Sequence, residues 1–287
     1  MSAGPQLFRF VQFEYPWLLG PEPGKYVVRD LGRTDASHVL VLATLGAPER
    51  RRLGKRRGAR TAPAEPETSP VPTTRVTVVP AEPLADEAAG RAWLLTARQD
   101  EHAERELADA LSVLTRAVRA HRLTTADAGL PEPRRDHALV VRLGYGSGDQ
   151  VIEGRYLAAV ELAPPERKRR RRTQVLHPQQ RLATLLGGHQ EPLICEELTL
   201  RARADLDAGR TRQAALQLRV AFEAALMELD GSASDQRLGE LRERRSDVGA
   251  AANAALQGPL DGDSAKAVEA TLDRLEAALR AHAAGRE

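Results

Sequence analysis

Residues 7–17, LFRFVQFEYPW, hold the clearest strand pattern of the chain and decide the fold of its N-terminal part. Apolar and polar side chains alternate from residue 11 onward, whereas the aromatic residues before that point hold the opposite phase. A change of phase within one strand predicts either a β-bulge or a strand that is buried on both faces. The first phase comprises Val11, Phe13, Tyr15 and Trp17, and the second comprises Phe8 and Phe10.

Aromatic residues are concentrated in this same region. The chain has only four Phe, four Tyr and two Trp, and six of these residues lie within the first 26 positions. Such a concentration is typical of the core of a sheet, and it is also typical of a face that binds a ligand or a partner. The sequence leaves both interpretations open.

The segments that follow predict an α+β domain over residues 1–163. KYVVRD, HVLVLATLG and TRVTVV read as further strands, and residues 83–122 carry the spacing of one long helix. Residues 137–162, HALVVRLGYGSGDQVIEGRYLAAVEL, read as two strands joined by a glycine-rich loop. Strands, a helix and then a hairpin predict a mainly antiparallel sheet with one long helix.

The glycine-rich run at 144–149, GYGSGD, follows a strand, as a phosphate-binding loop would. Such a loop also needs a helix directly after it, so that the first backbone N–H groups of the helix face the anion. VIEGRYLAAVEL reads instead as a second strand, and no GK[ST] motif follows. The run therefore predicts a hairpin turn.

Positive charge is concentrated in two tracts, although the formal net charge of the chain is only +2. Outside the tracts, 29 basic residues are set against 40 acidic ones. The first tract lies in a proline-rich segment, 47–72, which predicts a disordered loop, and the second predicts a basic linker at 164–174. Clustered Arg predicts either binding of a polyanion such as RNA, DNA or the ribosome, or solvation only. The candidate polyanion-binding residues are Arg50, Arg51, Arg52, Lys55, Arg56, Arg57, Arg60, Arg167, Lys168, Arg169, Arg170, Arg171 and Arg172.

Residues 175–287 predict an all-α domain built as a helical bundle. Helical patterns cover 177–186, 191–208, 210–229, 235–245, 246–257 and 263–284. The third and sixth of these carry apolar stripes that suit packing within a bundle. The stripes are Ala215, Leu218, Phe222, Ala225 and Leu229, and Val268, Leu272, Leu275 and Leu279.

Residues 196–229 resemble a single tetratricopeptide-type helical hairpin. Gly209 is followed by small or apolar residues at the spacing of that family, namely Ala214, Leu218 and Ala221, and is preceded by Leu198 and Ala202. The sequence departs from the family at Asp205, where a tyrosine is usual, and at Leu226, where a proline is usual, and no second repeat follows. The resemblance implies a protein-binding helical surface, and an ordinary αα-hairpin would explain the same residues.

Catalytic, cofactor and metal signatures are not found in the sequence. The single cysteine, Cys195, lies six residues after His189, beside Glu196 and Glu197, so that a metal or thiolate site and a buried structural cysteine are both conceivable. A lone thiol and no apolar segment long enough to span a bilayer predict a cytoplasmic protein without membrane insertion. We therefore expect a non-enzymatic interaction or adaptor protein whose partner is another protein or a second copy, with polyanion binding as the alternative.

Overall fold

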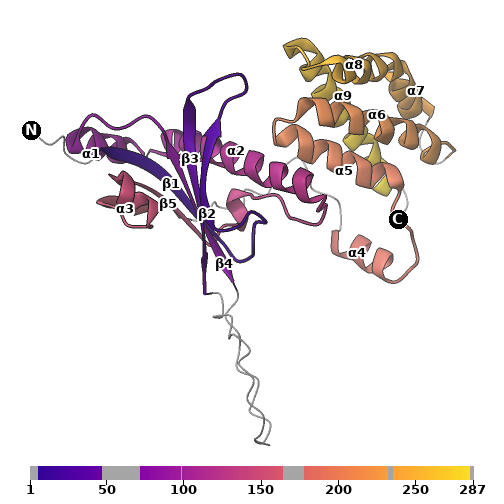
Figure 1. Cartoon of the computed structure of the whole chain (residues 1–287). Helices are drawn as coiled ribbons and strands as arrows, with labels where there is room; N and C mark the ends of the chain where they lie inside the picture. The colour runs from indigo at the N-terminus through magenta and orange to yellow at the C-terminus, as the bar shows by residue number, and fades with distance from the viewer. Residues whose placement is uncertain (1–5, 47–71, 98, 164–177, 232–234, 285–287) are drawn as a thin grey trace, which may run out of the picture. The chain divides into compact units, whose positions relative to one another are not determined.

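The computed structural model describes residues 6–46, 72–97, 99–163, 178–231 and 235–284. The chain divides into two compact units, Met1–Lys168 and Arg169–Glu287. The first unit contains a sheet and helices, and the second contains helices in its described part (Figure 1). The predicted fold class is thereby confirmed. The predicted linker at 164–174 lies outside the described residues, as does the predicted loop at 47–72 apart from Pro72.

A six-stranded sheet forms the centre of the first unit, and each pair of neighbouring strands is antiparallel. The spatial order is β2-β3-β4-β1-β5-β6, so the first strand of the chain lies in the interior of the sheet. The strands are β1 (Leu7–Tyr15), β2 (Gly24–Arg29), β3 (Ala36–Leu45), β4 (Thr73–Pro80), β5 (Val140–Ser147) and β6 (Ala158–Glu161).

Strand β1 is buried on both faces, which explains its change of phase. Its register with β5 runs without a shift from Leu7 to Glu14, so the β-bulge interpretation is wrong for this strand. Phe13 and Tyr15 belong to the core beneath the helices, whereas Phe10 packs on the opposite face. All three rings are at most 1% exposed, so these aromatic residues serve the core rather than an open binding face.

Two helices cover one face of the sheet, where the sequence predicted one continuous helix. They are α1 (Glu87–Thr96) and α2 (Asp100–Thr125), and both contribute to the core that contains Phe13. The helical pattern is interrupted because Gln99 has an extended backbone, with φ −81° and ψ 130°. The break turns the chain so that Leu94 of α1 and Leu107 of α2 both reach the same core.

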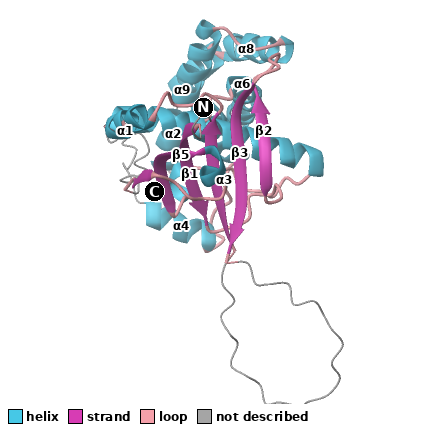
Figure 2. Ribbon diagram, turned by 60° about the vertical axis from the view of Figure 1, so that its left-hand side comes forward, coloured by secondary structure: helices cyan, strands magenta, loops and turns pink. Residues whose placement is uncertain are grey.

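The glycine-rich run is not a loop: residues 144–147 belong to β5, and Gly148 and Asp149 begin a helix. This short helix, α3 (Gly148–Ile152), starts directly after β5, and β6 then pairs antiparallel with β5. The predicted strand pair is present, but its connection contains α3, which lies on the face opposite α1 and α2 (Figure 2). A Cβ atom at Gly144 would lie only 2.6 Å from the ring of Phe10 and 2.6 Å from the carbonyl oxygen of Ala158. Glycine is needed there for close packing and not for phosphate binding.

A 3₁₀ turn, η1 (Arg135–His137), precedes β5 and completes the described elements of the first unit. Close packing recurs between α1 and the sheet, because a Cβ atom at Gly90 would lie 2.8 Å from the ring of Tyr145. The absence of a side chain at Gly90 thus allows α1 to lie close to the sheet.

The second unit has six helices in its described residues, and each corresponds to a predicted one within a few residues. The core holds both predicted stripes, together with alanines that allow the helices to approach closely. Gly209 lies between the second and third helices of this unit, and its positive φ of 71° allows the tight turn that joins them. The helices are α4 (Pro178–Leu186), α5 (Ile194–Asp207), α6 (Thr211–Glu228), α7 (Asp235–Glu243), α8 (Arg245–Gln257) and α9 (Gly262–Ala284).

Candidate interaction surface

The structure does not test the strongest polar feature of the sequence. Both arginine tracts, 50–60 and 167–172, lie outside the described residues. Polyanion binding by these residues therefore stays a prediction.

Cys195 lies at the start of α5 and is fully buried in the core of the helical unit. Burial is the largest cause that raises the pKa of its thiol, and the hydrogen bond to Glu228 acts in the same direction. The thiol therefore stays protonated at neutral pH, which suits a structural cysteine rather than a metal ligand or a nucleophile. His189 is exposed, and within the described ranges no three His, Cys, Asp or Glu side chains are grouped to hold a metal ion.

Glu228, at the end of α6, caps the N-terminus of α5. Its carboxylate accepts hydrogen bonds from the backbone N–H groups of Ile194, at 3.1 Å, and Cys195, at 2.9 Å. Partial burial acts to raise the pKa of Glu228, but the hydrogen bonds from Cys195 and Ile194 outweigh it, and the pKa is lowered. A charged residue of one helix thus caps the neighbouring helix and fixes the two ends of the hairpin together.

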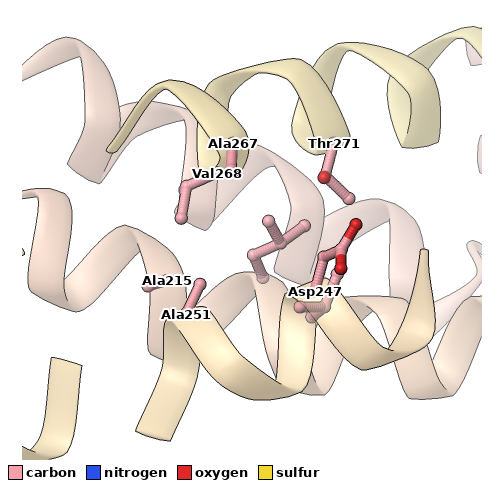
Figure 3. A pocket seen from close by; sticks show the side chains of 8 residues that line it. Ala215, Asp247, Ala251, Ala267, Val268 and Thr271 are labelled. Carbon is pink, nitrogen blue, oxygen red and sulfur yellow. The ribbon is translucent and has the colours of Figure 1, made fainter. Parts of the chain in front are cut away.

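A small hollow lies between α6, α8 and α9 (Figure 3). Apolar side chains line most of it, namely three alanines with Leu218, Val248 and Val268, and Asp247 and Thr271 provide its polar side-chain atoms. The enclosed space is about that of one water molecule, so the hollow does not suit a small-molecule substrate. It is the space left where short side chains meet between helices.

Helix α6 carries a second apolar stripe, on the side opposite its core stripe. We call this set, whose members repeat at +4, +4 and +3, the α6 stripe. Val220 is 55% exposed and Met227 is 79% exposed, whereas Leu216 and Ala224 are half-buried and also pack against the core of the helical unit. The α6 stripe consists of Leu216, Val220, Ala224 and Met227.

Different side chains flank the α6 stripe on its two sides. Toward α8 lie Arg219 and Glu223, and Arg245 of α8 donates to both carboxylate oxygens of Glu223, at 3.0 and 2.8 Å. On the other side the helical periodicity places the amide of Gln217, whereas Gln213 lies seven residues before Val220 and so continues the α6 stripe toward its N-terminal end. An apolar centre between polar and charged flanks is the usual composition of a protein-binding surface.

The apolar surface continues at one end of the hairpin. Ile194 is 65% exposed, and its backbone N–H bonds to Glu228, the residue after Met227. The exposed side chains of Ile194 and Met227 therefore lie at the same end of α5 and α6. Ile194 thus adds a third exposed apolar side chain, near the C-terminal end of the α6 stripe.

The sequence contained a signal for this surface that the prediction did not use. Leu216, Val220, Ala224 and Met227 have helical spacing of their own, beside the core stripe that the prediction did identify. A helix with two apolar faces indicates either a central helix or a helix with an external partner. Only the structure shows which face remains exposed.

Membrane spanning is not indicated by the helices, because none in the described part of the chain combines the necessary length with the necessary apolar character. Comparison of the chain with protein-family models, with curated proteins and with solved structures found no significant match.

Proposed function

We propose that this chain is a binding protein rather than an enzyme, and that its helical unit binds another protein chain through the α6 stripe. One observation carries the proposal: α6 buries one apolar face in its own core and leaves a second one exposed at Val220 and Met227. Water around exposed apolar side chains is released when a partner covers them, which favours association.

The tetratricopeptide-like hairpin supports the same function. In this proposal α5 and α6 present a surface to a protein partner, as the resemblance implies, and Glu228 keeps the two helices in a fixed relation. A pre-arranged surface loses little conformational freedom when it binds, which favours affinity.

Site-specific photo-cross-linking in cells that make the full chain tests this function. A photoreactive phenylalanine analogue at position 220 should form a cross-link to a protein chain, and the Met227→Glu substitution should abolish that cross-link. The matched control is position 256 on α8, because Leu256 is also exposed, at 64%, but lies outside the α6 stripe. Equal cross-linking from both positions, or none from position 220, would contradict the proposed function.

Polyanion binding remains the second candidate, because 13 of the 42 basic residues lie in the two tracts. Replacement of Arg167, Arg169, Arg170, Arg171 and Arg172 by Gln should weaken retention of the full chain on heparin, and wild-type retention should fall steeply with salt. Unchanged retention in the variant would remove these residues from consideration.

A further inference from the structure

We infer that the partner of the α6 stripe is a second copy of this chain, and that the two α6 helices pack antiparallel about a twofold axis. The inference rests on the proposed function, because it names the partner of the same surface. A twofold contact uses one patch twice, so the patch must be complementary to itself.

The apolar side chains satisfy this condition. When two α6 helices lie antiparallel and are centred near residue 222, Leu216 of one copy lies opposite Met227 of the other. Val220 then lies opposite Ala224, and each copy contributes the same pairs. In these two central pairs the larger Val220 meets the smaller Ala224, so the two helices can approach closely at their middle.

The charges on one flank select the antiparallel arrangement. In an antiparallel twofold pair, the flank toward α8 meets the same flank of the second copy, so Arg219 lies near Glu223 of the other chain, twice. The side chains of Arg219 and Glu223 are 43% and 34% exposed, and the charge pair across the contact would add to the pairs that Glu223 makes within its own chain with Arg219 and Arg245. In a parallel pair, this flank would instead meet Gln217, and no opposite charges would face each other.

The size of the surface sets the strength of association. One helix face with a few flanking residues is at the low end of the range for specific interfaces. We therefore expect a reversible dimer with a dissociation constant of about 1 to 100 μM rather than an obligate one.

Sedimentation velocity of the purified full chain over about 1 to 300 μM measures this equilibrium directly. Wild type should shift from monomer to dimer, and Val220→Glu with Met227→Glu should raise the dissociation constant about a hundredfold or more, because charges would be buried in the contact. Leu256→Glu is the matched control and should leave the dissociation constant unchanged. An unchanged circular dichroism melting curve confirms that the double variant is folded.

A charge exchange tests the antiparallel geometry. The triple variant Arg219→Glu, Glu223→Arg and Arg245→Glu inverts the charges and preserves the pairing within each chain. It should dimerise with itself, but its mixed dimers with wild type should be about fivefold rarer than random mixing gives, as measured by energy transfer between labelled chains. The matched control exchanges another ion pair, Glu240→Arg with Arg274→Glu, and should mix freely.

The outcomes separate this inference from the proposed function. A monomeric wild type whose position 220 still cross-links to a different protein overturns the dimer and keeps the binding function. A monomeric wild type without any cross-link removes both. A cross-link within one chain, a dimer that survives Val220→Glu with Met227→Glu, or free mixing of the triple variant with wild type overturns the antiparallel α6 contact.

Discussion

Strand β1 and helix α6 lie at the centres of their units, and each is apolar on two faces, but the two elements differ in how those faces are used. Both faces of β1 are covered, one by α1 and α2 and the other by α3 with neighbouring side chains. Helix α6 has one face in the core and the other exposed at Val220 and Met227. An element with two apolar faces therefore indicates a core only where the fold supplies a second layer.

The contrast between β1 and α6 requires that the second face of β1, around Phe10, is tightly packed. The Phe10→Ala substitution tests this requirement most directly. The ring of Phe10 is 1% exposed and packs over Gly144, so its removal should lower the free energy of unfolding of the sheet unit by about 3 to 5 kcal/mol. Fluorescence during urea unfolding measures this unit alone, because both tryptophans, Trp17 and Trp93, belong to it. A loss below about 1 kcal/mol would show that the second face is loosely packed.

The next largest loss of stability is expected at Gly144, because Phe10 and Ala158 pack closely against it. Gly144→Ala forces a Cβ atom against the Phe10 ring and the Ala158 carbonyl oxygen, so it should destabilise the sheet unit by about 1 to 3 kcal/mol. Gly239→Ala in α7 is the matched control, because nothing lies within 4 Å of the added atom. That substitution should stabilise the helical unit by up to about 1 kcal/mol, as followed by circular dichroism at the helical band. Equal effects of the two substitutions would contradict the packing explanation of Gly144.

Glu228 joins the end of α6 to the start of α5, and its titration should make the stability of the helical unit depend on pH. Its pKa is lowered from the ordinary value of 4.5 in the folded state, so its stabilising effect is complete above that value and is lost as the pH falls through the folded pKa. Glu228→Gln should destabilise the helical unit by about 0.5 to 2 kcal/mol at neutral pH and flatten the loss of stability below about pH 4.5. Helical circular dichroism during urea unfolding at several pH values measures both effects. Parallel pH curves for the variant and wild type would rule out this role.

The smallest effect on folding is expected at the exposed face of α6. Val220→Glu should change the free energy of unfolding of the monomeric helical unit by no more than about 0.5 kcal/mol, since position 220 is already in contact with water. The neighbouring Leu218→Glu, which buries a charge at a position 1% exposed, serves as the contrast and should unfold the unit. A large loss from Val220→Glu, measured by circular dichroism at low protein concentration, would place residue 220 in a core rather than on a surface.

Side-chain periodicity predicted the fold well where the spacing of apolar residues fits a strand or a helix but not both. Strand character was predicted for residues 7–17 and is confirmed for residues 7–15, and the predicted core stripe of α6 is confirmed. The break between α1 and α2 was not predicted, because residues 98–102, RQDEH, are all polar and suit an exposed helical turn as well as a break, and only the shared core requires the chain to turn. The helix α3 was missed because Val151 and Ile152 suit a strand as well as a helix.

The candidate surface was less predictable than the fold. The four residues of the α6 stripe could be found from their spacing, but their exposure depends on where α5, α8 and α9 pack, which is a property of the whole unit. Glu228 caps a helix that begins 34 residues earlier in the chain, so no local sequence pattern indicates this role.

The position of Glu228 also affects how the hairpin opens. The first N–H groups of a helix ordinarily have local partners or water, so they fray and exchange hydrogen with solvent quickly. Here the N–H groups of Ile194 and Cys195 are bonded to a residue of the following helix. Their hydrogen exchange should therefore report the separation of α5 from α6, which makes two amides at a helix end slow probes of the integrity of the whole hairpin.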